Sequence, residues 1–283
     1  MQLSPCVSIQ QTDTGLEYLA IESALCSATI FLQGAQLASF TPKDSAPLIW
    51  MSEDEDYQQG KGLRGGIPIC WPWFGVSQTQ GWPIHGVART SLWRAEEVNE
   101  HENHIEVSLS LPMRSVDKTY WPHNTELKVV FHLSTQLKVT LINTNLGDST
   151  LELTQALHTY FPTSDITATQ VDGLQGSQFI EFGEGPFAQN EVVNFARETD
   201  MVYTQAAPMQ HIRTPEGTIA VGREQSTSCV LWNPWIEKAK RLSNFQDDEY
   251  KTMLCLEAGN VMEDKVVLEP GQSHRLSTVI YWL

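Results

Sequence analysis

The chain has 283 residues, and acidic side chains outnumber basic ones, which gives a formal net charge of −16 at pH 7. Such a charge disfavours nucleic acid and anionic membrane surfaces as partners. No stretch of the sequence approaches the roughly 18 apolar residues that a membrane-spanning helix needs. The polar residues from Met1 to Gly15 also lack the apolar core of a signal peptide, so we expect a cytoplasmic protein.

The cysteines indicate neither a disulfide framework nor a zinc site. The sequence has five of them, an odd number, and they are widely spaced without a CxxC pair. A chain of this length can bury a large core without a covalent or metal staple. Cys255 lies in an apolar run, which predicts a buried thiol with no chemical role.

Short runs rich in β-branched and aromatic residues recur along the chain and predict strands. In chain order these runs cover residues 105–111, 127–133, 137–143, 151–161, 218–221, 228–232, 251–258 and 277–282. Helical periodicity is scarce, and the spacing of Trp235, Ala239 and Leu242 predicts one short helix around residues 236–242. No repeat or linker divides the chain. The sequence therefore predicts an all-β fold, an antiparallel sandwich or barrel with few short helices, as a single domain over residues 1–283.

Residues 57–95 differ in composition from the rest of the chain, because none of the 34 acidic residues falls there. The segment carries the basic residues Lys61, Arg64, Arg89 and Arg94 and the tryptophans Trp71, Trp73, Trp82 and Trp93. Arginine binds phosphate through forked hydrogen bonds, and a local positive patch attracts anions at short range. Tryptophan offers a flat apolar surface for the C–H face of a sugar. The segment predicts a pocket for an anionic sugar, unless the lack of acids is chance and the tryptophans are core residues.

Two titratable residues lie in strand-like runs. Strand alternation places His158 on the same face as Ala156 and Tyr160, and Glu257 on the same face as Met253 and Cys255. The apolar run around Glu257 is typical of a strand buried on both faces, where a carboxylate needs a partner or a task. Burial raises a carboxyl pKa, and a histidine can donate a proton near pH 7, so the pair suits acid–base chemistry. A structural histidine and a buried ion pair remain the alternatives.

Other polar residues are ambiguous from the sequence alone. His85 suits a site or a core position equally well, and Asp200 follows Glu198 in a polar loop as an ordinary surface acid would. The remaining histidines show no metal-ligand spacing: His101, His104, His123, His132, His211 and His274. Asp200 and Glu257 leave a two-carboxylate glycosidase open, whereas the lack of a GxSxG elbow disfavours a serine hydrolase. No glycine-rich phosphate loop is present, so side chains would have to hold a phosphate.

The motifs taken together resemble the hexose-6-phosphate mutarotases, or glucose-6-phosphate 1-epimerases, a branch of the aldose 1-epimerase superfamily. The resemblance runs from about residue 15 to the C-terminus, and its most specific part is the stretch RGGIPICWPWFG. The matching segments are 64–75, 85–89 (HGVAR), 156–161 (ALHTYF), 232–234 (WNP), 247–251 (DDEYK) and the strand with Glu257.

The resemblance implies a galactose-mutarotase-like β-supersandwich with the site on its concave face. It also implies His158 as general acid, Glu257 as general base, and Arg64 and Arg89 as phosphate ligands. His85 and Asp200 would lie against the sugar. No metal or organic cofactor is expected, and the partner would be a hexose 6-phosphate bound by a monomer.

One position departs from the family pattern. The residue before the HG pair can be polar in this family, whereas here it is Ile84, which cannot form a side-chain hydrogen bond to the sugar. Two rival functions remain for the same scaffold: a non-catalytic sugar-phosphate-binding protein and an aldose 1-epimerase acting on neutral hexoses. An acidic structural or regulatory protein would leave the acid-free segment unexplained.

Overall fold

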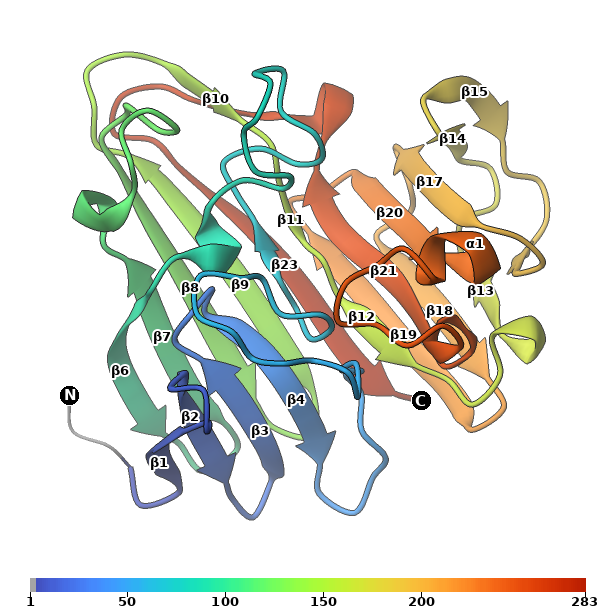
Figure 1. The fold of residues 1–283 in the computed structure, drawn as a ribbon, viewed down its shortest axis with the longest axis horizontal. Helices are drawn as coiled ribbons and strands as arrows, with labels where there is room; N and C mark the ends of the chain where they lie inside the picture. The colour runs from blue at the N-terminus through green and yellow to red at the C-terminus, as the bar shows by residue number, and fades with distance from the viewer. Residues whose placement is uncertain (1–3) are drawn as a thin grey trace.

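The computed structural model describes residues 4–283 and consists almost entirely of antiparallel sheets. A nine-stranded sheet forms one layer. In Figure 1 it begins with β6 at the left and includes β23, the strand that leads to the C-terminus. Its strands, in spatial order, are β16 (Val193–Asn194), β13 (Gln170–Asp172), β18 (Met209–Thr214), β19 (Gly217–Glu224), β23 (Ser273–Trp282), β9 (Leu137–Asn145), β8 (Thr125–Leu133), β7 (Ile105–Leu111) and β6 (Arg94–Glu100).

An eight-stranded sheet packs against part of this layer. Its strands are, in order, β15 (Glu184–Ala188), β14 (Gln178–Glu181), β17 (Thr199–Thr204), β20 (Ser228–Asn233), β21 (Met253–Asn260), β11 (Gln155–Leu157) and β5 (Ile69–Cys70), with β12 (Tyr160–Pro162) also paired to β21. Two smaller sheets complete the fold: β1 (Val7–Gln11), β2 (Glu17–Glu22), β3 (Cys26–Phe31) and β4 (Gln36–Pro42), and the pair β10 (Leu151–Leu153) and β22 (Val266–Leu268). A bridge between Leu37 and Ile67 joins the β1–β4 sheet to the segment before β5.

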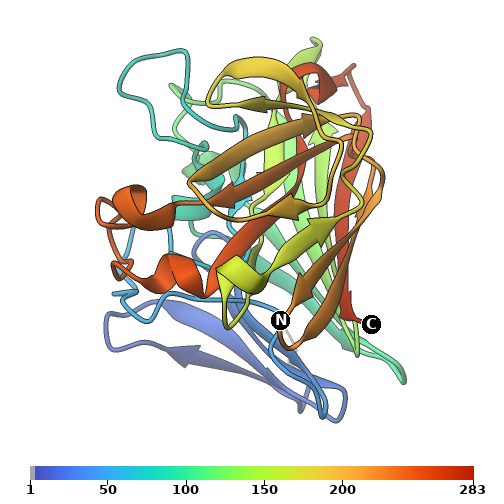
Figure 2. The same ribbon diagram turned by 90° about the vertical axis from the view of Figure 1, so that its right-hand side faces the viewer.

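The helices are short and lie in the connections. They are α1 (Trp235–Ala239) and the 3-10 turns η1 (Ala88–Thr90), η2 (Met113–Ser115), η3 (Ile166–Ala168), η4 (Glu249–Lys251) and η5 (Met262–Asp264). Figure 2 shows α1 and long loops standing out on the side of the molecule away from the nine-stranded sheet. No helix in the described residues is long and apolar enough to cross a membrane.

Strand β21 lies in the middle of the eight-stranded sheet, and all eight of its residues are buried. One of its faces, with Leu254 and Leu256, belongs to the large core between the sheets. Met253 and Cys255 on the other face pack in a second cluster, with Trp50, Tyr160, Trp232, Ala239 and Phe245. Burial on both faces explains why this strand is apolar almost without alternation, as the sequence predicts.

Asn233 links three elements at one end of this second cluster. Its side-chain Nδ2 donates to the carbonyl oxygens of Tyr250 and Met253, and its Oδ1 accepts from the backbone N–H of Trp235 at 2.9 Å. The asparagine of the WNP motif therefore ties the end of β20 to the start of α1 and to the start of β21.

Three sequence-based expectations need correction. The run 151–161 is not one strand but three, β10, β11 and β12, and residues 158 and 159 lie outside them. Asp200 lies in strand β17 and not in a loop. The helix ends at Ala239 and continues only as turns, with the Leu242 N–H bonded to the Ala239 carbonyl oxygen. The other predicted strands are present, most with ends one to four residues away.

Candidate functional site

His158 and Glu257 are cross-strand neighbours on the outer face of the eight-stranded sheet. The pairs Leu157–Ala258 and Tyr160–Cys255 keep the same register on either side of them, so His158 lies opposite Glu257. His158 Nε2 is 3.3 Å from Glu257 Oε1. Glu257 is 1% exposed and His158 is 9% exposed, so the two groups meet in a position that is almost inaccessible to water.

The break between β11 and β12 turns the backbone of His158 towards the neighbouring segment. The His158 N–H donates to the Pro68 carbonyl oxygen at 3.0 Å, while the Thr159 carbonyl oxygen accepts from the Leu256 N–H. The His158 ring stacks on Tyr160, with centroids 5.0 Å apart, and meets the Trp232 ring edge-on at 6.2 Å. Backbone hydrogen bonds and aromatic contacts therefore fix the orientation of this imidazole.

Burial favours the neutral form of each group. It raises the pKa of Glu257 well above its ordinary value, with a further increase from the Asp200 charge and a decrease from Arg89. It lowers the pKa of His158, as do His85, Arg89 and Arg64. Among the described residues, His158 Nδ1 and Glu257 Oε2 have no hydrogen-bond partner. Buried polar atoms of this kind need an explanation, and a bound polar ligand would supply one.

His85 lies beside this pair. Its Nδ1 accepts a hydrogen bond from the Gly75 N–H at 3.1 Å, and its ring lies 5.6 Å from that of His158. Burial, together with the charges of Arg89 and Arg64, lowers the pKa of His85 to about 3. A neutral imidazole that accepts at Nδ1 carries its proton on Nε2, so His85 offers an N–H donor.

The HG motif has a conformational reason. His85 has φ +65°, and Gly86 has φ +74° with the Trp71 carbonyl oxygen only 2.0 Å from the position of a Cβ atom. The Val87 N–H donates to that same oxygen at 2.8 Å. Glycine at position 86 therefore allows the chain to pass against Trp71 and places His85 beside His158.

Arg64 and Arg89 line one cavity of about 260 Å³, together with Lys61, Tyr160 and the segment Ser243–Asn244. Arg64 Nε donates to the Ser243 carbonyl oxygen at 3.3 Å. The Arg89 guanidinium donates to the Ile84 carbonyl oxygen at 3.0 Å, so the backbone of Ile84 helps to position this arginine. Because Tyr160 lines the cavity and stacks on His158, the arginines and the His158–Glu257 pair share one wall.

Two buried acidic residues, Glu55 just before the acid-free segment and Glu249 of η4, hold this cavity in shape. The buried Glu55 carboxylate accepts from the backbone N–H groups of Arg64 and Tyr57 and from the Asn244 side chain. Glu249 similarly accepts from the Ser52 hydroxyl and the Glu53 N–H. The sequence analysis assigned neither residue a role, although Glu55 lies just before the acid-free segment and Glu249 lies in the motif DDEYK.

Asp200 lies at the opposite rim, in register with Trp232 of β20. Lys238 of α1 is 3.7 Å from its carboxylate and 5.9 Å from the centre of the Trp232 ring. Burial raises the pKa of Asp200, whereas Lys238 lowers it. Asp200 also acts on Glu257 electrostatically, so it belongs to the same site.

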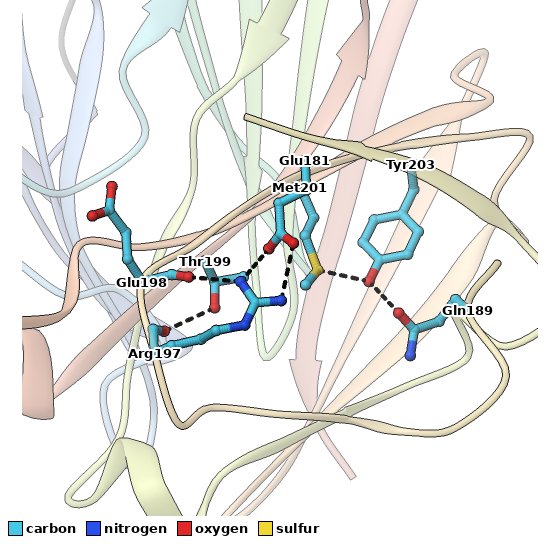
Figure 3. A network of polar contacts seen from close by, with 7 residues as sticks. All are labelled: Glu181, Gln189, Arg197, Glu198, Thr199, Met201 and Tyr203. Carbon is cyan, nitrogen blue, oxygen red and sulfur yellow. Dashed lines mark hydrogen bonds and ion pairs between the residues drawn. The ribbon is translucent and has the colours of Figure 1, made fainter. Parts of the chain in front are cut away.

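Figure 3 shows polar contacts around β17, the strand that carries Asp200. Both terminal nitrogens of Arg197 donate hydrogen bonds to the Glu181 carboxylate, at 2.6 and 2.9 Å. The Tyr203 hydroxyl donates to Gln189 Oε1 at 2.9 Å and contacts the Met201 sulfur. Together these contacts fix the loop that leads into β17.

The prediction that the tryptophans of this segment line the pocket is wrong, because none of the four lines the arginine cavity. Trp71 and Trp93 are buried in the core between the sheets, and neither lines the arginine cavity. Trp73 and Trp82 are partly exposed and pack on each other and on Tyr120. Trp232 and Tyr160 instead provide the aromatic surface next to His158, and the sequence analysis assigned neither of them that role.

Six dispersed residues thus converge on one face, around a buried imidazole–carboxyl pair: His158, Glu257, His85, Arg64, Arg89 and Asp200. Such a site lies on the outer face of a large antiparallel β-sandwich. The fold and the site together indicate a β-sandwich protein that binds a ligand or catalyses a reaction on it. The model of the family "Aldose 1-epimerase" matches residues 18–281. The chain therefore belongs to the aldose 1-epimerase family and is an epimerase, as the resemblance predicts.

Relatives with known names agree with this assignment. A Salmonella typhimurium protein named "Putative glucose-6-phosphate 1-epimerase" is 33% identical over 98% of this chain and 94% of its own length. A protein of the same name from Cenchrus ciliaris is 35% identical over 96% of this chain and 86% of its own length.

Solved structures agree on the fold. The crystal structure of a Salmonella typhimurium protein described as a putative mutarotase has a TM-score of 0.91 and 30% identity, covering 99% of this chain and 94% of that one. A galactose mutarotase-like protein from Lactobacillus casei has a TM-score of 0.68 at 14% identity, covering 94% of this chain and 100% of that one. This second likeness concerns the fold alone.

Proposed function

We propose that this epimerase interconverts the α and β anomers of a hexose 6-phosphate, such as glucose 6-phosphate. The supporting observation is the contact between His158 and Glu257, which shares a wall with the cavity lined by Arg64 and Arg89. The pair has the functional groups for proton transfer at the anomeric carbon, and the guanidinium groups suit a distal phosphate. The names of the relatives point to the same substrate class.

The reaction needs two proton transfers and no change in oxidation state. Glu257 takes the proton from the anomeric hydroxyl, so that C1 and O1 form a carbonyl group. The bond between C1 and the ring oxygen breaks, and the ring oxygen takes a proton from His158. Rotation about the C1–C2 bond presents the other carbonyl face, and ring closure reverses the two transfers to give the opposite anomer.

The pair carries one proton throughout this cycle. Burial favours a carboxylic acid beside a neutral imidazole, and the 3.3 Å contact allows transfer to the carboxylate–imidazolium form that starts the reaction. After ring opening the pair again consists of a carboxylic acid and a neutral imidazole. The proton therefore has to be assigned to the pair as a unit and not to either residue alone.

The remaining polar residues position the substrate. Arg64 and Arg89 hold the phosphate, so the anomeric end of the sugar is presented to the pair in a fixed orientation. His85 donates its Nε2 proton to a sugar oxygen, and Asp200 accepts from a sugar hydroxyl at the opposite rim.

Exchange spectroscopy by NMR tests this proposal without a coupled assay. Catalytic amounts of protein should increase the rate of exchange between the anomers of glucose 6-phosphate, and much less that of free glucose. Equal acceleration of both sugars would indicate an epimerase of neutral hexoses. Exchange of glucose 6-phosphate at the spontaneous rate would support a sugar-phosphate-binding protein.

A further inference from the structure

Three histidines and a glutamate gather on the outer face of the nine-stranded sheet, whereas Glu257 of the catalytic site lies in the eight-stranded sheet. Glu106 of β7 is in register with His132 of β8, and His132 Nε2 lies 2.9 Å from Glu106 Oε2. His104 precedes β7 in the hairpin turn between β6 and β7. These two strands lie side by side at the left of Figure 1.

Strand alternation explains why these side chains point away from the core. The neighbours Ile105 and Val107 in β7, like Phe131 and Leu133 in β8, are buried in the core between the sheets. Glu106 and His132 therefore project from the opposite face, where their side chains are 30% and 38% exposed. The cluster is reachable from solvent without any movement of the sheet.

The donor atoms are close enough to share an ion. One ligand atom each from His104, Glu106 and His132 lies within 4.8 Å of the others. In a tetrahedral zinc site with bonds of about 2.0–2.1 Å, ligand atoms are about 3.3 Å apart. Side-chain rotation of partly exposed residues can close the remaining difference.

The hydrogen bonding of His104 favours ligation through its other ring nitrogen. His104 Nδ1 lies 2.8 Å from Asn103 Oδ1, which leaves Nε2 as the lone-pair donor when the hydrogen bond is made by Nδ1–H. Among the described residues, His132 Nδ1 is buried without a hydrogen-bond partner. The His101 ring stacks on His104 at 4.3 Å.

We propose that His104, Glu106 and His132 form a surface site for a divalent transition-metal ion of the zinc class, with water in the fourth position. Two imidazoles and one carboxylate form a donor set that suits Zn²⁺ better than Mg²⁺ or Ca²⁺. A bound ion ties the turn between β6 and β7 to the neighbouring strand β8. It therefore stabilises the edge of the nine-stranded sheet and takes no part in the sugar reaction.

Isothermal titration of the chelator-treated protein with Zn²⁺ tests the site. We expect one equivalent of Zn²⁺ to bind and thermal unfolding to shift upward with zinc concentration. His104→Ala and His132→Ala should each weaken this binding by more than about 100-fold, and Asn103→Ala by about 10–100-fold. His123→Ala, which removes an exposed histidine outside the cluster, is the matched control and should leave binding unchanged.

His158→Ala separates this site from the catalytic one, since zinc could also bind at His158 and Glu257. The proposal requires that this variant keep the zinc equivalent. Three results would overturn the proposal: no binding up to millimolar Zn²⁺, binding that depends on His158 but not on His104 and His132, or loss in only one of the two cluster variants. Circular dichroism of each variant identifies those that fail to fold, and for these Glu106→Gln provides the alternative substitution.

Discussion

The imidazole of His158 meets the carboxyl group of Glu257 at 3.3 Å because the interrupted strand β11–β12 and strand β21 keep their register on both sides of the pair. Both residues are nearly inaccessible to solvent, and burial shifts their pKa values in opposite directions. Two neighbouring groups whose pKa values are shifted in opposite directions by their environment are a common arrangement for acid–base catalysis. The predictions below follow from this pair and from the residues around it.

Replacing Glu257 by Gln should stabilise the fold, and the gain should grow with pH. The carboxyl pKa is higher in the folded than in the unfolded chain, so above about pH 4.5 the unfolded chain ionises while the native one stays protonated. Wild-type stability therefore falls as pH rises within that window, by up to about 1.4 kcal/mol per pH unit, whereas Gln does not titrate. Thermal unfolding of both proteins at pH 5 and pH 7 measures the difference. A gain that does not change with pH would contradict the raised pKa.

Replacing Asp200 by Asn should shift the pH–rate profile to lower pH. The Asp200 charge raises the pKa of Glu257, so removing it makes every protonated form of the pair easier to deprotonate. Both limbs of the profile for anomer exchange should move in the acidic direction. Glu198→Gln is the control, because Glu198 also contacts Lys238, at 3.2 Å, but is not among the charges that shift Glu257. An unchanged profile in Asp200→Asn would remove Asp200 from the electrostatics of the site.

Arg64→Ala and Arg89→Ala should discriminate between phosphorylated and free sugars. A charge-assisted hydrogen bond contributes about 1.5–3 kcal/mol, so each substitution should lower kcat/KM for glucose 6-phosphate by about 10–150-fold. The rate with free glucose should change little. Arg94→Ala is the matched control, since Arg94 comes from the same acid-free segment but pairs with Glu96 at the surface. Equal losses with both sugars would argue against a phosphate-binding role.

Gly86→Ala should unfold the protein far more easily than Gly81→Ala. Both glycines have positive φ, +74° at Gly86 and +83° at Gly81, so each substitution costs about 1–2 kcal/mol of backbone strain. Only at position 86 would the new Cβ collide with backbone, at 2.0 Å from the Trp71 carbonyl oxygen, whereas Gly81 has open space. We expect an additional cost of about 3 kcal/mol or more in urea unfolding. Similar stabilities of the two variants would show that the close approach is unimportant.

Local sequence pattern predicted most strands because each has its own hydrophobic periodicity. The all-β class, the buried strand around Glu257 and the shared face of His158 and Tyr160 are confirmed. The break at residues 158 and 159 was not predicted, because it depends on the bond from His158 N–H to Pro68, a partner distant in the chain. Asp200 was misplaced in a loop for a similar reason, since only pairing with β20 makes its segment a strand.

The site was partly predictable for the same physical reason. A resemblance in motif supplied the residues, whereas the sequence alone could not show which aromatic rings would surround them. Trp71 and Trp93 are buried in the core between the sheets, whereas the register of the sheet places Trp232 beside His158. The histidine cluster was missed because its ligands are neighbours across strands and not along the chain. The single domain, the monomeric state and the cytoplasmic location stay predictions.

The most direct test of the account is the rate of glucose 6-phosphate anomer exchange in His158→Ala, Glu257→Gln and the double variant, each shown to be folded. If the two groups act together on one bond, each single variant should lose about 10²–10⁴-fold, and the double variant little more than the worse single one. A near-normal rate in either single variant, or losses that multiply in the double variant, would contradict the claim that one His–Glu pair performs the chemistry.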